Sequence, residues 1–356
     1  MKRRQTRTVR LGRIRIGSGH PVSVQGMTKT HTADVEATVR QIRELALRGC
    51  DIVRVAVPRT EDADAIAAIR KEIDGLPLVA DVHFDHRLAI RALEAGADGV
   101  RINPGNLRDM DAVAEVVHVA AHRDACIRIG VNSGSIRPRD DDTDADIDLA
   151  ELLAGKTLEY LEFVESLDFT NVKLSLKASD VPTTLQATRL AAEACDAPLH
   201  IGITAAGPPR TSLVRSAVGI GTLLAGGIGD TVRVSMTGSP VEEVTAACDI
   251  LETLELRERT RPRIISCPTC GRCEIDLARV VDEVERRLPA DAPAVSIAVM
   301  GCVVNGPGEA AEADVGIAGG KGFGYLFRRG EKVRRVEEHE MVDALVEEVM
   351  KLKAAP

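Results

Sequence analysis

Four cysteines in two short motifs are the residues of this chain best suited to carry chemistry. Cys267, Cys270 and Cys273 have the spacing C-x2-C-x2-C, and Cys302 follows within a glycine-rich stretch at 301–309. Three close thiolates and one distant thiolate are typical of a [4Fe–4S] cluster, which this spacing predicts with four cysteine ligands. A zinc site with four thiolate ligands stays open as an alternative, although such sites usually contain two separate C-x2-C pairs.

Basic side chains alternate with apolar ones along several segments that are rich in β-branched residues. The alternation runs through residues 52–57, 100–103, 127–132, 172–177 and 232–235. Because successive side chains of a β-strand point to opposite faces, each segment has one apolar face and one polar face. The polar faces carry six basic residues, which are Arg54, Arg101, Arg128, Lys173, Lys177 and Arg233.

The six basic residues predict a ligand that contains phosphate. Asp81 is the only obvious acidic residue on the same faces, and a buried charge without a partner is costly. The fork of an arginine side chain fits phosphate oxygens well. Internal ion pairing is the alternative. His83 and His200 follow the same alternation, and we interpret both as hydrogen-bonded structural residues in preference to catalysts.

The elements that must position these side chains alternate between strands and helices from residue 22 to about residue 258. Helical spacing of apolar residues predicts helices in segments such as 33–48, 61–73 and 240–257. Strands are predicted at 22–27, 51–57, 78–84, 99–103, 126–132, 171–178, 199–204 and 231–236. Eight strands that alternate with helices predict an α/β fold, a (β/α)8 TIM barrel with its active site at the carboxyl ends of the strands. An open, doubly wound sheet is the alternative.

The alternation ends near residue 261, where a second and smaller α/β domain is predicted to begin. The predicted boundaries are 1–260 for the barrel and 261–356 for the domain with the cysteine motifs. The second domain is expected to contain a helix at 273–288, a strand at 294–300 and a helix at 338–353.

Three further segments are interpreted without a function. We expect the glycine-rich string at 319–324 to form turns, with a phosphate-binding loop as the weaker alternative. The acidic run at 140–146 is expected to be a solvated loop. The basic segment at 1–7 is expected to be a frayed tail.

The composition limits the classes of partner. The chain has 356 residues, a formal net charge of −8, five Phe, two Tyr and no Trp, which disfavours nucleic acid as a partner. The longest uncharged stretch, 292–308, is too short for a membrane span, and the N-terminus lacks the apolar region of a secretory signal. Cysteines without an export signal are typical of the cytoplasm, where we expect the protein. We interpret the cysteines outside the motifs as buried and inert; they are Cys50, Cys126, Cys195 and Cys248.

Six short motifs in the barrel segment precede the two cysteine motifs in an order that is typical of one enzyme family. They are VRVA at 53–56, ADVHFD at 80–85, RINPGN at 101–106, RIGVN at 128–132, KASD at 177–180 and GIGDT at 227–231. Together these motifs resemble the bacterial 4-hydroxy-3-methylbut-2-enyl diphosphate synthases over nearly the whole chain. The resemblance implies a barrel joined to a cluster domain. It also implies a head-to-tail homodimer in which one chain's cluster caps the other chain's barrel mouth.

The resemblance implies a different set of cluster ligands from the cysteine spacing. Matched motif to motif, the family's three cysteines and one glutamate are Cys267, Cys270, Cys302 and Glu309, which leaves Cys273 outside the set. We follow the resemblance, because a carboxylate on one iron is more exchangeable than a thiolate. An exchangeable position lets that iron bind a substrate oxygen, so Glu309 is also the expected catalytic residue.

The resemblance also implies a reaction. This is the two-electron reductive ring opening of 2-C-methyl-D-erythritol 2,4-cyclodiphosphate to 4-hydroxy-3-methylbut-2-enyl diphosphate, with loss of water, in the non-mevalonate isoprenoid pathway. Electrons are expected to arrive singly from ferredoxin or flavodoxin. The family's substrate contacts match Arg54, Arg101, Asn103, Arg128, Asn132, Lys177, Arg233 and Ser235. Strand alternation by itself places all of these on the inner face, together with Lys173.

One departure from the family concerns the proton supply. The family usually has Thr-Glu-Ala-Gly after the seventh strand, and this chain has Ala205 in place of the glutamate. Three explanations stay open: another acid serves (Glu309 or Asp81), the substrate differs, or the chain is impaired. Two rival functions also remain, a redox sensor that binds the cyclodiphosphate without converting it and a zinc-containing barrel transferase with a phosphate ligand.

Overall fold

The computed structural model describes residues 2–136, 148–289 and 291–353. The acidic run at 140–146, expected to be a solvated loop, lies outside these described residues. The chain divides into two compact units, Met1–Arg257 and Glu258–Pro356. The first unit contains the alternating segments, and the second contains both cysteine motifs.

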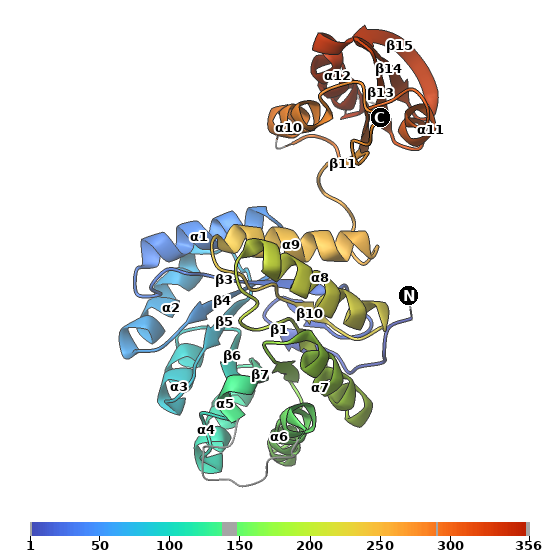
Figure 1. Ribbon diagram of the computed structural model, residues 1–356. Helices are drawn as coiled ribbons and strands as arrows, with labels where there is room; N and C mark the ends of the chain where they lie inside the picture. The colour runs from blue at the N-terminus through green and yellow to red at the C-terminus, as the bar shows by residue number, and fades with distance from the viewer. Residues whose placement is uncertain (1, 137–147, 290, 354–356) are drawn as a thin grey trace. The chain divides into compact units, whose positions relative to one another are not determined.

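A parallel sheet forms the centre of the first unit (Figure 1). Among the described residues its eight strands follow the order β8-β7-β6-β5-β4-β3-β10-β9. The strands are β3 (Ser23–Met27), β4 (Ile52–Ala56), β5 (Leu78–Asp81), β6 (Gly99–Ile102), β7 (Cys126–Asn132), β8 (Val172–Lys177), β9 (His200–Ile201) and β10 (Thr231–Val232). A parallel bridge between Leu174 and Leu199 connects the two ends of the sheet, so the barrel is nearly closed. The predicted (β/α)8 barrel is confirmed.

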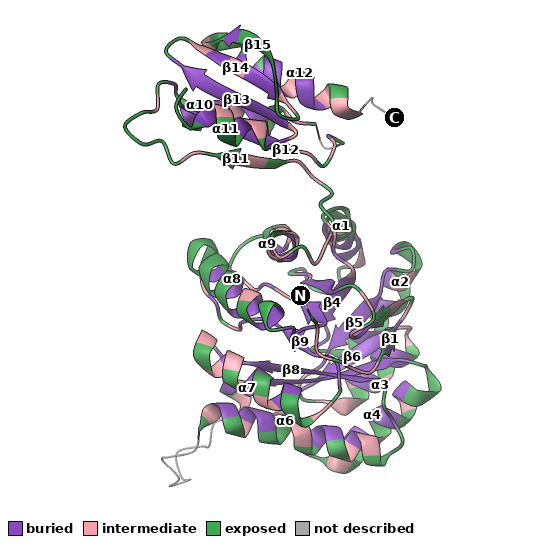
Figure 2. Cartoon of the chain, turned by 90° about the vertical axis from the view of Figure 1, so that its right-hand side faces the viewer, coloured by how far each residue is buried: buried purple, intermediate pink, exposed green. Residues whose placement is uncertain are grey.

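Helices surround the sheet and cover its apolar face. They are α1 (Val35–Leu47), α2 (Thr60–Glu72), α3 (His86–Glu94), α4 (Met110–His122), α5 (Ser133–Ile136), α6 (Leu149–Ser166), α7 (Val181–Ala194), α8 (Pro209–Ala225) and α9 (Pro240–Thr253). Aspartates cap several of them; Asp85, for example, accepts a hydrogen bond from the amide of Arg87 at the start of α3. Figure 2 shows buried strands inside and exposed outer faces on the helices. None of the described helices is long and apolar enough to cross a membrane.

The last two barrel strands are shorter than the sequence predicts. The predicted strands span 199–204 and 231–236, but β9 and β10 contain two residues each. The two segments approach closely where the regular ladder stops, since a Cβ on Gly202 would lie 2.3 Å from the carbonyl oxygen of Arg233. The residues that follow β9 and β10 therefore lie in loops at the carboxyl end of the barrel.

The N-terminal segment is not a frayed tail, and this expectation was wrong. Its arginines hold it to the barrel: Arg3 pairs with Asp230 at 2.6 Å, and Arg4 donates to the carbonyl oxygen of Ala197 at 2.6 Å. A hairpin of β1 (Val9–Leu11) and β2 (Ile14–Ile16) follows. Its apolar side chains pack on residues at the amino ends of the barrel strands, and this small cluster consists of Val9, Leu11, Ile16, Ile52, Val79 and Cys126. The hairpin closes the amino end of the barrel.

The second unit is built on a mixed sheet with the strand order β11-β12-β13-β14-β15. Its elements are β11 (Arg263–Ser266), α10 (Leu277–Arg287), β12 (Ser296–Met300), α11 (Gly306–Ala311), β13 (Val315–Gly320), β14 (Phe323–Arg328), β15 (Glu331–Glu337), the short 3-10 helix η1 (Glu338–Glu340) and α12 (Met341–Lys353). Helices α10 and α12 share one apolar cluster with the sheet, and α11 belongs to another. Because the strand residues of the two clusters alternate, α11 covers the opposite face.

The glycine-rich string at 319–324 forms a turn at Lys321 and Gly322, so its interpretation as turns holds for these two residues but is wrong for the other four, which are strand residues. It belongs to the hairpin of β13 and β14, in which Gly319 pairs with Gly324. These glycines allow close packing: a Cβ on Gly319 would lie 2.7 Å from Ile275, and one on Gly324 would lie 2.8 Å from Met341. The glycines thus mark crowded strand positions, which local sequence does not distinguish from turns.

Candidate active site

A cavity of about 80 Å³ opens among the carboxyl ends of the barrel strands. Its lining residues are Arg54, Asp81, His83, Arg101, Arg128, Gly130, Asn132, Ser175, Lys177, Thr204, Arg233 and Ser235. Seven of the eight residues expected to contact the substrate are among them. The eighth, Asn103, is buried beside the cavity, where its amide oxygen accepts hydrogen bonds from the Gly105 amide at 3.1 Å and the Ser135 hydroxyl at 3.2 Å.

Two of the buried cations in this cavity have no acidic partner. Neither Arg128 nor Lys177 forms an ion pair with a described residue, although both are buried. Among the described residues, the hydrogen-bond partners of the Arg128 side chain are neutral: the amide oxygen of Gln25 at 3.3 Å and Nε2 of His200 at 3.2 Å. Burial lowers the pKa of the Lys177 ammonium group, and the positive charges of Arg128 and Arg233 lower it further. The cavity therefore has a deficit of negative charge that an anionic ligand would compensate.

Asp81 balances part of this positive charge. Its carboxylate lies 3.8 Å from Nε of Arg54, 3.4 Å from Nη1 of Arg101 and 3.6 Å from Nε2 of His83. Burial alone would raise the pKa of Asp81, but the charge of Arg54, followed by His83 and Arg101, holds it far below its ordinary value. Asp81 is therefore a carboxylate at neutral pH, which argues against Asp81 as the acid that replaces the family's glutamate.

Glu243 is a second acidic partner that the sequence did not reveal. It lies in the first turn of α9, is buried, and pairs with Arg233 at 3.5 Å and with Lys29 at 3.0 Å. Asp81 remains the acidic residue expected on the strand faces, and Glu243 adds a partner from a helix, which strand alternation does not address. An acidic residue in the first turn of a helix is ordinary, so its position gives no signal of an inward contact.

Lys173 lies in the barrel interior but not on the cavity wall. Its side chain is 1% exposed, and its ammonium nitrogen has no hydrogen-bond partner among the described residues. Burial lowers the pKa of Lys173 to about 8, although the nearby Cys126 opposes the shift. The structure thus separates Lys173, which the family motifs do not claim, from the cavity residues.

We expect the stability of the protein to rise between pH 8 and pH 10.5 because of Lys173. In this range the unfolded chain binds a proton on this lysine and the folded chain does not, so folding becomes more favourable as pH increases. The shift corresponds to about 3 kcal/mol. Urea unfolding of the Lys173→Met variant should show a smaller pH dependence than the wild type and a higher stability at pH 7. If the free energy of unfolding depended on pH in the same way in the two proteins, Lys173 would not be the source of the effect.

Ala205 lies at the rim of the cavity, directly after the lining residue Thr204. It is exposed, and its φ of 47° is in the left-handed region, which is uncommon for a residue with a side chain. Its methyl group carries no acidic proton. The structure therefore leaves the position of the family's glutamate without an acid.

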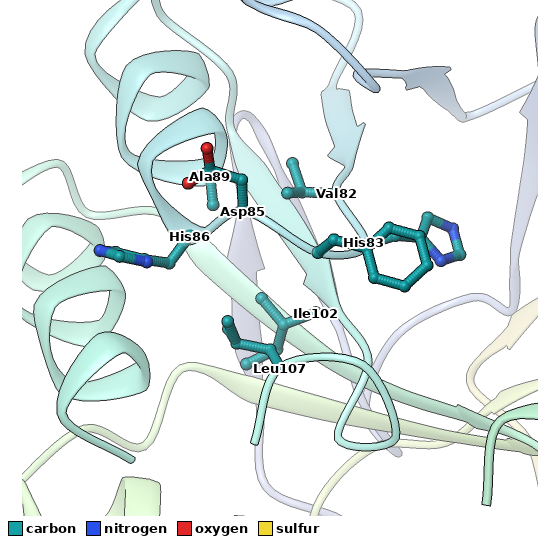
Figure 3. A pocket seen from close by; sticks show the side chains of 8 residues that line it. Val82, His83, Asp85, His86, Ala89, Ile102 and Leu107 are labelled. Atoms are coloured by element: carbon teal, nitrogen blue, oxygen red, sulfur yellow. The ribbon is translucent and has the colours of Figure 1, made fainter. Parts of the chain in front are cut away.

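A second, apolar hollow lies beside the cavity, lined by residues that include Val82, His83, His86 and Leu107 (Figure 3). It is too narrow to admit a water molecule, and Figure 3 shows His83 and His86 on its opposite sides. His83 is hydrogen-bonded on the cavity side, to Arg101 at 2.9 Å and Asn106 at 3.1 Å. We therefore place the ligand in the cationic cavity and not in this hollow.

The cysteine motifs meet in the second unit at Gly301. The amide of Gly301 donates to Sγ of Cys267 at 3.4 Å, and a Cβ on Gly301 would lie 2.3 Å from Sγ of Cys273. The absence of a side chain at this position lets both sulfurs approach the loop that carries Cys302. Cys273 donates a hydrogen bond to the carbonyl oxygen of Ile275 at 3.3 Å.

Cys270, Cys302 and Glu309 share the neighbourhood of one cation, Arg272, whose pKa their negative charges raise. A backbone hydrogen bond and the side chain of Arg272 lower the pKa of Cys270. Backbone amides at 304–306 lower the pKa of Cys302. Thiolates are the form in which cysteine binds a metal. Within the described ranges, no three His, Cys, Asp or Glu side chains are close enough together to hold a single metal ion.

The fold and the site define a class of protein. It is a (β/α)8 barrel with a buried cationic cavity, followed by a small unit in which two loops carry cysteines. Two family models match this chain, the GcpE TIM-barrel domain over residues 6–248 and the GcpE protein C-terminal domain over residues 263–351. The chain belongs to the GcpE family of enzymes.

Curated relatives match the chain over nearly its full length. A 4-hydroxy-3-methylbut-2-en-1-yl diphosphate synthase (flavodoxin) of Dehalococcoides mccartyi is 50% identical over 350 residues, which cover 98% of this chain and 99% of that protein. The protein of the same name from Geobacter sulfurreducens is 50% identical over 350 residues and covers 98% of both chains. The family resemblance seen in the motifs is confirmed.

Solved structures of lower identity resemble this chain in fold. Dihydropteroate synthase from Thermus thermophilus has a TM-score of 0.51 at 18% identity and covers 70% of this chain and 98% of its own. N-acetylneuraminic acid synthetase from Leptospira borgpetersenii has a TM-score of 0.50 at 13% identity, with 80% and 97% covered. At these identities the likeness concerns the fold only.

Proposed function

We propose that this chain converts 2-C-methyl-D-erythritol 2,4-cyclodiphosphate to 4-hydroxy-3-methylbut-2-enyl diphosphate. The substrate takes up two electrons, its ring opens, and one oxygen leaves as water with protons from the protein or solvent. The relatives that are 50% identical over almost the whole chain have this synthase activity in their names. The observation that carries the proposal is the cavity itself, in which Arg128 and Lys177 are buried without an acidic partner among the described residues.

The cavity residues bind and orient the diphosphate in this proposal. Arg54, Arg101, Arg128, Lys177 and Arg233 supply the positive charge. Arginine forks can each contact two phosphate oxygens. Asn132 and Ser235 are positioned on the same wall to donate further hydrogen bonds. Asn103 acts indirectly, because it holds the loop after β6 through Gly105 and Ser135.

The second unit fits a [4Fe–4S] cluster through the chemistry of its donors. We propose Cys267, Cys270, Cys302 and Glu309 as the ligands. The bare backbone at Gly301 leaves room beside Cys267, and Arg272 and backbone amides favour the thiolates of Cys270 and Cys302. When bound, such a cluster supplies electrons one at a time and a Lewis-acidic iron. We propose Glu309 as the ligand that gives way to substrate.

Three further properties belong to the proposal. Flavodoxin is the electron donor named in the relatives, and we propose flavodoxin, with ferredoxin as the alternative, for this chain. The family resemblance supports a head-to-tail homodimer in which one chain's cluster serves the other chain's barrel. A reducing cytoplasm suits a chain whose described cysteines form no disulfide with one another.

A single-turnover assay tests the function. Protein purified without oxygen is reduced chemically and mixed with the cyclodiphosphate, and the product is followed by 31P NMR. Formation of the linear diphosphate supports the synthase. Binding without ring opening would instead favour the redox sensor. Stoichiometric zinc without iron, with activity that is insensitive to oxygen, would favour the zinc-containing transferase.

The Ala205→Glu variant should turn over faster than the wild type, by about tenfold or more, because it supplies an acid at the cavity rim. Ala205→Gln is the matched control, since it has the same shape, the same backbone conformation and no exchangeable carboxyl proton. The measurement is the single-turnover rate as a function of pH. Equal rates for the two variants would contradict the role assigned to this position.

A further inference from the structure

An exposed surface with an apolar centre and a basic edge lies beside Cys302. We define this donor surface by Val303, Val304, Phe323, Tyr325, Lys332 and Arg335. Val303 is 44% exposed and Val304 is 64% exposed, although both are aliphatic. Lys332 and Arg335 lie on the edge strand β15 and are exposed.

The apolar centre is in direct contact with the cysteine loop. Val303 follows Cys302 in the chain, and the side chains of Val303 and Phe323 both lie beside the bare backbone of Gly320. A Cβ on Gly320 would lie 3.0 Å from Val303 and 3.1 Å from the ring of Phe323. Tyr325 stands edge-on to Phe323 with 5.5 Å between ring centroids, and it packs on the same small apolar cluster as Cys267. The donor surface therefore joins both cysteine motifs.

Two cations of the edge are held in place by these rings. Nζ of Lys332 lies 3.2 Å from the centroid of the Tyr325 ring, and the guanidinium carbon of Arg335 lies 4.4 Å from that of Phe323. Such contacts orient the cations without burying them. Arg335 also pairs with Glu337 at 3.5 Å. The charges are presented to solvent at fixed positions next to an apolar centre.

The charge of this region is opposite to that of the whole chain. Residues 321–335 contain six basic side chains and one acidic one, Glu331, in a chain with a net charge of −8. Of these basic residues, Arg328 is paired with the buried Glu348. A local basic patch on an acidic protein attracts a partner of negative charge and guides its approach.

We propose that the donor surface is where an acidic, one-electron carrier protein docks to deliver electrons to the cysteine-bound group. This inference rests on the proposed function and adds the place of electron entry. The apolar centre allows close approach to Cys302, and the basic edge supplies attraction and orientation. Interfaces of this kind are small and transient, which suits a carrier that must leave after each electron.

The test reverses the two ring-bound charges in the double variant Lys332→Glu/Arg335→Glu. With reduced flavodoxin as donor, we expect the second-order rate constant for reduction of the enzyme to fall by about tenfold to a hundredfold at low salt. The difference should shrink as ionic strength increases, because exposed charges are screened. Single-turnover product formation after chemical reduction should be unchanged.

The matched control is Arg286→Glu, an exposed arginine on α10, which covers the other face of the same sheet. This variant should keep the wild-type rate with flavodoxin. Equal losses in both variants would show a general charge effect and would overturn the proposal. A changed oligomeric state of the double variant in sedimentation, or a changed turnover after chemical reduction, would instead identify a contact between copies of the chain. Failure of the wild type to convert substrate after chemical reduction concerns the proposed function alone.

Discussion

Replacing Cys302 by serine should prevent binding of the proposed iron–sulfur cluster and abolish turnover, while the barrel stays folded. The Cys302 side chain accepts hydrogen bonds from the backbone amides at 304–306, which lower the pKa of its thiol and prepare a thiolate for iron. A serine hydroxyl at this position is a far poorer ligand for iron. Since the barrel has its own apolar core in a separate compact unit, loss of the cluster should not unfold it.

The companion variant Cys273→Ser separates the two ligand assignments. Its thiol already donates to the carbonyl oxygen of Ile275, and a serine hydroxyl can do the same. Iron content, the visible absorption of the cluster and its EPR signal after reduction are the measurements. We expect Cys273→Ser to keep about four iron atoms per chain and Cys302→Ser to lose them. The reverse result would assign Cys273 in place of Glu309 as the fourth ligand.

The Arg128→Met variant should lose cyclodiphosphate binding by about a hundredfold or more and yet be at least as stable as the wild type without ligand. Arg128 is 3% exposed, and its hydrogen bonds to described residues are with neutral groups, so its charge is unfavourable in the free protein and useful only with an anion present. Replacing buried charge by an apolar side chain of similar size is often neutral or stabilising by about 1–4 kcal/mol.

Urea unfolding with and without the cyclodiphosphate measures both effects in one experiment. The wild type should gain stability from the ligand in proportion to the logarithm of its concentration, and Arg128→Met should gain little. Lys173→Met is the matched control, because it removes a buried cation from the same barrel interior but not from the cavity wall. A variant at position 128 that is destabilised and still binds would contradict the role given to Arg128.

The inner face of the barrel could be predicted from the sequence because strand alternation is a local property. Strand alternation correctly places four basic residues on the inner face, namely Arg54, Arg101, Arg128 and Lys177. The alternation does not indicate how far along the strand the ligand lies, so it could not distinguish Lys173 from the residues that line the cavity. Only the closed barrel, with its register between strands, decides this.

The contacts that sequence reasoning missed are made between different elements of the fold. Glu243 reaches Arg233 from the following helix, and Arg3 contacts Asp230, which lies 227 residues further along the chain. Nothing in the local pattern of either residue distinguishes such a partner from an ordinary surface charge. Gly319 and Gly324 were misleading for a related reason, because their role is to admit side chains from other elements.

The β1–β2 hairpin determines by which end substrate and product enter and leave the barrel. Its apolar side chains fill the amino end, where Leu11 and Ile16 are fully buried. The cavity is consequently closed at the amino end of the barrel and has a single rim at the carboxyl ends of the strands. Substrate and product must pass the same rim in opposite directions. Product therefore has to leave the cavity before the next substrate molecule can bind, and product competes directly with substrate for the same cations.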